Sequence, residues 1–218
     1  MTEAKAVPIK DLILVPSIIT LAVTLLRLVG ELRDWSPALF GKQAGGGGTL
    51  VGISWLIPVF GFYFGWRLAR MGHAAANAGK LVGFSILAVA VLIGIGVGAQ
   101  AVKLNPIVTL FVFCLASLAA LAFVFPVWPA FSRTAVAYAL AARIPVAIVM
   151  LAAILGNWGT HYDVAPPDAP QVDAMAPLVK WLLIGLLPQM TIWIFTTVAG
   201  GAVFAGIASL IAGRSRAS

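Results

Sequence analysis

Long apolar runs separated by short polar connections dominate the sequence. Crossing ~30 Å of hydrocarbon takes roughly 20 apolar residues in a helix, and six runs are long enough. The predicted spans cover about residues 12–32, 50–69, 81–102, 107–125, 134–155 and 181–211. We therefore predict an all-α fold, a polytopic transmembrane helix bundle of about six spans that forms one integral membrane domain over residues 1–218.

Prolines and glycines interrupt the predicted helices. Asn105-Pro106 precedes the fourth span, because proline lacks a backbone N–H and suits a helix start. The last apolar run extends from Leu178 to Ala212, which is longer than one straight crossing requires. We expect Pro188 or the pair Gly200-Gly201 to kink it, or its first turns to lie along the membrane interface.

Glycines recur at four-residue spacing in or beside two predicted spans, a pattern that lets helix backbones approach closely in lipid. The pairs are Gly61 with Gly65, Gly79 with Gly83, and Gly94 with Gly98. We interpret all three pairs as packing sites inside the bundle. A dimer seam or a substrate path is the alternative.

The composition agrees with a lipid environment. Of the 218 residues, 61% are hydrophobic and 10% are charged, whereas a soluble domain carries about 25% charged residues. The net charge of +7 could suggest a nucleic-acid partner. However, the basic residues are scattered between apolar runs and form no stripe, so we exclude nucleic acid and take the lipid bilayer as the main partner.

The positions of lysine and arginine predict the orientation, because these residues concentrate on the cytoplasmic side. With six spans, eight of them fall on one side: Lys5, Lys10, Arg67, Arg70, Lys80, Arg133, Arg214 and Arg216. The other side holds Arg33, Lys42, Lys103 and Lys180, with Arg27 just inside the first span. We therefore predict both termini in the cytoplasm and an irregular outer loop between spans five and six. We expect a multi-pass protein of the cell membrane, inner or plasma membrane, of a bacterium.

Arg143 lies ~13 Å along the fifth predicted span. No Asp or Glu occurs in the interior of any span. An unpaired guanidinium at that depth costs between ~3 and more than 10 kcal/mol, so it must face protein, water or an anion. Three arrangements are open. Arg143 could bond the carbonyls of Ala141 and Ser54, which Pro145 and Pro58 would free. It could reach the cytoplasmic interface. It could also bind an anionic ligand or a lipid headgroup.

The segment from Gly156 to Asp163, called the outer segment below, concentrates polar and aromatic side chains at the outer end of the fifth span. Candidate binding residues here are Trp158, His161, Tyr162 and Asp163. An imidazole titrates near neutral pH, and a nearby carboxylate would favour its protonated form. His161 and Asp163 supply two metal ligands, too few for a metal site, so we predict no metal and no cofactor. An interfacial helix cap is the alternative to a ligand or partner site.

Arg27 and Glu31 lie four residues apart, on one face of the first predicted span. This spacing favours an ion pair at the membrane edge, and a gate charge is the alternative. We predict that the outer segment contacts either this pair or the outer end of the last span, near Lys180 and Trp181.

Three classes of function remain open. The leading hypothesis is a small transporter or channel-like protein with a site near Arg143 or in the outer segment, because prolines interrupt several spans. The alternative is a non-catalytic subunit of a larger membrane complex, or a homo-oligomer, docked through the outer segment. A membrane enzyme is the third class, and we expect no catalytic residues, since the sequence contains neither His-Glu-x-x-His nor Gly-x-Ser-x-Gly.

Overall fold

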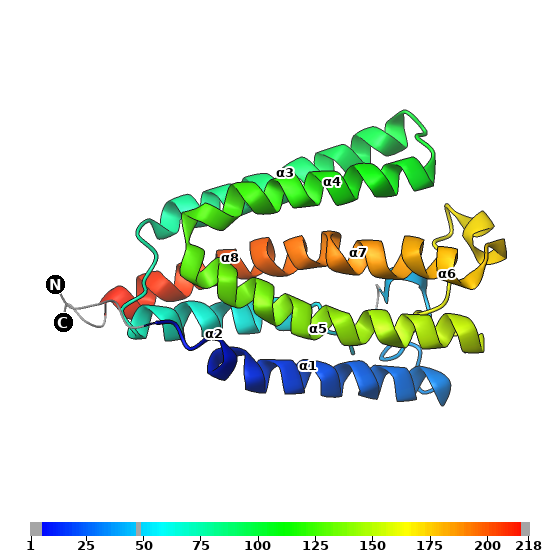
Figure 1. The fold of residues 1–218 in the computed structure, drawn as a ribbon, viewed down its shortest axis with the longest axis horizontal. Helices are drawn as coiled ribbons and strands as arrows, with labels where there is room; N and C mark the ends of the chain where they lie inside the picture. The colour runs from blue at the N-terminus through cyan, green and yellow to red at the C-terminus, as the bar shows by residue number, and fades with distance from the viewer. Residues whose placement is uncertain (1–5, 47–48, 215–218) are drawn as a thin grey trace.

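The computed structural model of the chain describes residues 6–46 and 49–214. Figure 1 shows a bundle of helices with their long axes roughly aligned. Five helical segments are long and apolar enough to cross a membrane: α1 (Ile9–Leu32), α3 (Ala78–Ala101), α4 (Pro106–Val124, continued by a 3-10 turn to Val127), α5 (Pro129–Gly156) and the final segment from Pro177 to Ala212. The described residues contain no strand. The predicted all-helical membrane fold is therefore confirmed.

The helix α2 (Leu56–Arg70) is shorter than the predicted span of residues 50–69. Its 15 residues extend only ~22 Å, which is less than the hydrocarbon thickness. Pro58 explains where the helix begins, since its ring would clash with the Ser54 carbonyl inside a longer helix but is tolerated in a first turn. That carbonyl instead accepts a hydrogen bond from the Ile57 N–H at 3.2 Å. The sixth crossing thus combines a short helix with the irregular residues 49–55.

The final helical segment is deformed near its start. A short α6 (Pro177–Lys180) leads into a π-helix, η4 (Trp181–Leu186), then α7 (Leu187–Met190) and α8 (Ile192–Arg214). Pro188 removes the N–H that would bond the Ile184 carbonyl, which explains why the regular ladder fails just before it. A second break follows at Thr191, with φ −122° and ψ −74°. The kink that we expected therefore lies around Pro188, and Gly200-Gly201 lies inside the continuous helix α8.

The helix α1 begins and α8 ends at the same end of the bundle, at the left in Figure 1, as a fold with both termini on one side requires. The opposite end carries the connection between α1 and α2, the turn between α3 and α4, and residues 157–176. The lysine and arginine distribution predicts that this opposite end, called the outer end below, faces away from the cytoplasm. Lys5, Arg216 and Gly47-Gly48 lie outside the described residues.

The helix α8 forms the centre of the bundle and packs against α2, α3 and α5. Its contact with α2 is a backbone contact: a Cβ added at Gly61 would lie 2.5 Å from the Gly201 carbonyl oxygen, and one added at Gly65 would lie 2.5 Å from Ala205 Cα. The predicted packing role of this pair is confirmed.

The two glycine pairs of α3 do not pack inside the bundle. A Cβ added at Gly83, Gly94 or Gly98 would meet no atom within 4 Å, and one added at Gly79 would meet only the Asn77 side chain at 3.6 Å. The packing prediction is therefore wrong for these pairs. Four-residue spacing shows which residues share a helix face, but it does not show which face another helix covers.

Candidate functional site

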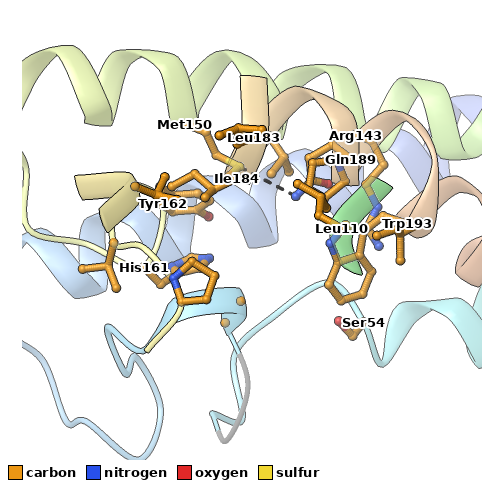
Figure 2. A pocket seen from close by; sticks show the side chains of 18 of the residues that line it. Ser54, Leu110, Arg143, Met150, His161, Tyr162, Leu183, Ile184, Gln189 and Trp193 are labelled. Carbon is orange, nitrogen blue, oxygen red and sulfur yellow. Dashed lines mark hydrogen bonds between the residues drawn. The ribbon is translucent and has the colours of Figure 1, made fainter. Parts of the chain in front are cut away.

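A cavity of about 390 Å³ lies in the outer half of the bundle. Its walls come from α1, α4, α5, the deformed start of the final segment, and both long outer connections (Figure 2). This volume falls within the range of about 300–1,000 Å³ that is typical of ligand sites in proteins. Four of the seven residues predicted from the sequence line it: Arg27, Arg143, His161 and Tyr162.

The late start of α2 explains why a cavity forms here. The helix α1 packs mainly on α5 and α4 mainly on α3 and α8, while α2 begins only at Leu56. The irregular connection that precedes α2 lines the space between them, through Gly45, Gly46, Gly52, Ile53 and Ser54. Irregular backbone at membrane depth is tolerated where protein buries it or where it borders a cavity, because its polar groups then avoid lipid.

Arg143 occupies the middle of α5. It lies 14 residues after Pro129 and 13 before Gly156, which places its Cα ~20 Å from each helix end. Only 4% of its surface is exposed. Arg143 therefore does not reach the cytoplasmic interface, one of the three arrangements open from the sequence, because its side chain is too short to span that distance.

The Arg143 side chain lines the cavity with an incomplete set of partners. Its guanidinium carbon lies 4.6 Å from the centroid of the Trp193 ring, a cation–π contact. Its Nε is buried and has no hydrogen-bond partner. The structure contains no hydrogen bond from this guanidinium to any described residue, so the carbonyls of Ala141 and Ser54 are not its partners. The guanidinium therefore borders the cavity with the Trp193 ring as its contact among the described residues.

Gln189 lies beside Arg143 in the cavity wall, and the sequence analysis missed it (Figure 2). Only 7% of its surface is exposed. Its Nε2 donates a weak hydrogen bond to the Met150 sulfur at 3.7 Å, while its Oε1 has no partner. The signal that could have found it is a polar amide inside an apolar run, directly after Pro188, because polar groups are rare within such runs. Trp193 was also missed, although it is a tryptophan well inside an apolar run.

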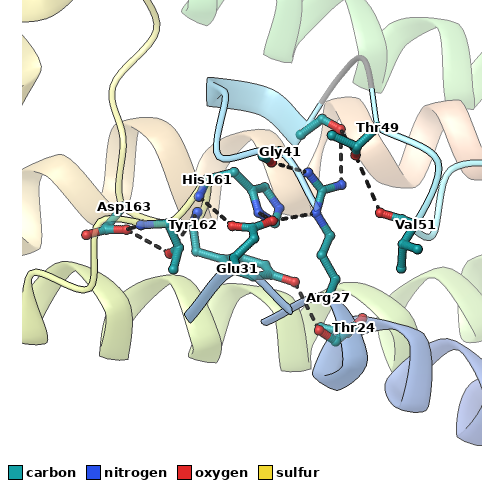
Figure 3. Close-up of polar contacts among 11 residues, drawn as sticks. Thr24, Arg27, Glu31, Gly41, Thr49, Val51, His161, Tyr162 and Asp163 are labelled. Carbon is teal, nitrogen blue, oxygen red and sulfur yellow. Dashed lines mark hydrogen bonds and ion pairs between the residues drawn. The ribbon is translucent and has the colours of Figure 1, made fainter. Parts of the chain in front are cut away.

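Glu31, near the end of α1, connects this helix to the outer segment at the outer end of the cavity (Figure 3). Its Oε1 lies 2.7 Å from Arg27 Nε and 2.6 Å from His161 Nδ1, and its Oε2 accepts the His161 backbone N–H at 2.8 Å. The predicted ion pair and the predicted contact of the outer segment with the first span are confirmed. We call Arg27, Glu31 and His161 the outer clasp. The carboxylate of Glu31 is fully buried, so each of these contacts forms away from water.

Arg27 extends the clasp to the connection between α1 and α2. Its Nη1 donates to the Gly46 carbonyl at 3.0 Å and its Nη2 to the Gly41 carbonyl at 3.1 Å. One buried ion pair on α1 therefore holds both outer connections over the cavity. The outer end of the last span makes other contacts: Lys180 pairs with Asp173 at 2.8 Å.

Two of the predicted site residues have structural roles. The helix α5 ends at Gly156, followed by Asn157 in the left-handed conformation with φ 47°. Both oxygens of Asp163 accept hydrogen bonds from residues that precede it in the chain: Oδ2 from the Gly159 N–H, and Oδ1 from the N–H and the hydroxyl of Thr160. Trp158 packs on Gly156. Neither Asp163 nor Trp158 lines the cavity, whereas Tyr162 does and donates to the Thr24 carbonyl at 3.2 Å.

Burial lowers the pKa of the His161 imidazole below its ordinary value of 6.5, although its hydrogen bond to Glu31 acts in the opposite direction. Of the nearby charges, that of Arg27 also lowers this pKa, and those of Glu31 and Asp163 raise it. The two carboxylates thus favour the protonated form as expected from the sequence, but burial outweighs them and the pKa falls. The lowered pKa favours the neutral imidazole in the closed clasp, and the contact of Nδ1 with Glu31 Oε1 suits the tautomer that carries its proton on Nδ1.

We expect acidification to loosen the outer clasp. When the outer segment is detached from Glu31, His161 takes up a proton below pH 6.5, whereas in the closed clasp it does so only at lower pH. Neutral His161 therefore stabilises the closed clasp fully above pH 6.5, and this stabilisation is lost as pH falls toward the lowered pKa. A maleimide reacts more slowly with any thiol at lower pH, because less thiolate is present. Between about pH 7 and about pH 5, its rate with a cysteine placed at Met150, in the cavity wall, should therefore fall less in the protein with His161 than in the His161→Asn variant. The variant His161→Asn keeps a side-chain hydrogen-bond donor but does not change its protonation between about pH 5 and about pH 7. If the ratio of rates is the same in both proteins, His161 is not the group responsible.

Comparisons of the chain with protein-family models, with curated proteins and with solved structures find no match.

Proposed function

We propose that this chain is a small membrane transporter that binds an organic anion at Arg143. The observation that carries the proposal is a buried guanidinium in mid-helix that borders a cavity and lacks a hydrogen-bond partner among the described residues. Leaving such a charge unpaired in a membrane is costly, and an anionic ligand would remove that cost. Location in a bacterial cell membrane is part of the proposal.

The contacts of Arg143 favour a carboxylate or a phosphate. Trp193 covers one face of the guanidinium, which leaves the in-plane edge that bonds planar or tetrahedral anions through two parallel hydrogen bonds. The other cation in the cavity wall, Arg27, is already paired with Glu31. Asp168 is the acidic residue among the described lining, and it is exposed. The deep part of the cavity is therefore electropositive.

Irregular elements beside Arg143 support transport over static binding. A short helix with an irregular lead-in and a π-helix before a proline are both present, and Ser54 and Ile184 bring them to the same cavity. Broken helices of this kind hold substrates near the bilayer centre in known transporter folds. A non-catalytic subunit of a larger complex is the alternative, and it would require no ligand in this cavity.

The proposal is tested by replacing Arg143 with methionine, which keeps the length of the side chain without its charge. A series of carboxylates and alkyl phosphates is screened by thermal stabilisation of the purified protein. The variant should lose at least ~10-fold in affinity, since a hydrogen bond to a charged group contributes about 1.5–3 kcal/mol. Uptake of the same anion into vesicles containing the protein should fall as well.

A second readout separates a ligand site from a structural arginine. Because no residue that the structure describes forms a hydrogen bond with Arg143, Arg143→Met should leave the ligand-free protein as stable as the native chain or more so. Lys42→Ala, which removes an exposed ion pair with Asp34, is the control for a lost positive charge. If Arg143→Met unfolds the protein, the arginine is structural, and if it binds anions normally, the proposal is wrong.

A further inference from the structure

We infer that the ligand is a single-chain amphiphile, an anionic head on an apolar chain, and that it enters the cavity sideways from the outer leaflet between α1 and α4. The inference rests on the proposed function, because Arg143 is the group that would bind the head. It adds the chemical class of the ligand and its route.

The cavity wall between its polar groups is apolar. The helix α4 contributes three apolar side chains along one face, and the opposite walls contribute more: Ile107, Leu110, Phe113, Val23, Leu183 and Ile184. A small hydrophilic anion would leave this surface in contact with water, which is unfavourable. An apolar chain would cover it. The volume of about 390 Å³ is near the low end for ligand sites, so it suits one chain rather than two.

The bundle lacks a covering helix on one side of the cavity. In Figure 1, α1 and α4 lie on opposite sides of α5 and the final segment, and neither packs mainly on the other. In the inner half of the bundle α2 packs against α8, but in the outer half the irregular residues before α2 take its place. Their exposed apolar side chains, Leu50 and Trp55, are suited to contact lipid. This side is therefore the natural route for a molecule already dissolved in the outer leaflet.

The position of Arg143 agrees with this route. Arg143 lies in the middle of α5, whereas the outer clasp and both outer connections cover the cavity at the outer end of the bundle. A water-soluble anion would have to displace that cover. An amphiphile in the leaflet would reach Arg143 by leaving its chain against α4, whose Leu110 and Phe113 side chains line the way.

The experiment measures binding of carboxylates from acetate to dodecanoate. Dodecyl phosphate tests a phosphate head on the same chain, and dodecyltrimethylammonium tests a cationic head. Binding is measured by isothermal titration calorimetry of the purified protein, and the heat that Arg143→Met still gives is subtracted. Affinity for carboxylates should rise by up to about fourfold per added methylene until the cavity is full. The cationic amphiphile should not bind. Carboxylate-only or phosphate-only binding identifies a fatty acid or a lipid phosphate as the source, and each supports the inference.

Two variants on α4 provide the matched test of the route. Leu110→Trp fills the cavity wall and should reduce dodecanoate binding at least 10-fold while acetate binding changes less than threefold. Leu115→Trp adds the same ring on the outer face of α4, where the side chain is 68% exposed, and should have no effect. Binding of acetate without any gain from chain length would overturn the inference and leave the anion site intact. Absence of Arg143-dependent binding by every anion would overturn both.

Discussion

Replacing Gly65 with valine is expected to prevent stable packing of α2 on α8. A Cβ at this position would lie 2.5 Å from both Ala205 Cα and the Ala205 carbonyl oxygen, which are backbone atoms that cannot move aside independently. In lipid, close packing takes the place of the hydrophobic effect in holding helices together. Overpacking a tight core costs about 1–3 kcal/mol, and separating two backbones lies at or above the upper end of that range.

Thermal stability and the monodisperse fraction in detergent measure this effect. Gly61→Val should behave similarly, because its Cβ would lie 2.5 Å from the Gly201 carbonyl oxygen. Gly94→Val and Gly98→Val are the matched controls on α3, where an added Cβ meets nothing within 4 Å. Equal tolerance of valine at all four positions would show that α2 and α8 do not approach as closely as described.

Replacing Glu31 with alanine should release both outer connections at once. This carboxylate binds Arg27 and His161, and Arg27 in turn holds the Gly41 and Gly46 carbonyls. Removing one partner of a buried ion pair costs about 3–5 kcal/mol, because the remaining charge stays desolvated. We expect a large loss of stability, concentrated at the outer end. Glu31→Gln should have a smaller effect, since the amide oxygen still accepts a hydrogen bond.

Labelling of a cysteine in the cavity wall measures the release. In a background of Cys114→Ala, a cysteine at Met150 should react with a membrane-impermeant maleimide several-fold faster when Glu31 is alanine. Asp34→Asn removes the exposed pair with Lys42, worth at most about 1 kcal/mol, and should leave the rate unchanged. A rate as slow in the Glu31 variant as in the Asp34 variant would mean that the outer clasp does not hold the cover in place.

The apolar runs alone determined that this chain is a helical membrane protein. Lipid offers no hydrogen bonds, so a long apolar segment must satisfy its backbone internally as a helix, whatever its neighbours are. Local signals were equally reliable at Pro106, which begins α4, and at Pro188, where the final segment deforms. Arg27 and Glu31 form the ion pair that their spacing predicted, since four residues bring two side chains together on any helix.

Contacts between segments distant in sequence were decided only by the tertiary structure. Spacing alone could not distinguish Gly65, which contacts α8, from Gly94, which faces outward, because the covered face depends on the neighbouring helix. Apolar composition could not show that residues 50–55 leave the helix to border a cavity. Nor could it show that Arg143, Gln189 and Trp193, from α5, α7 and α8, converge there. A buried charge is tolerated or costly according to what surrounds it in space, and that surrounding is set by the whole bundle.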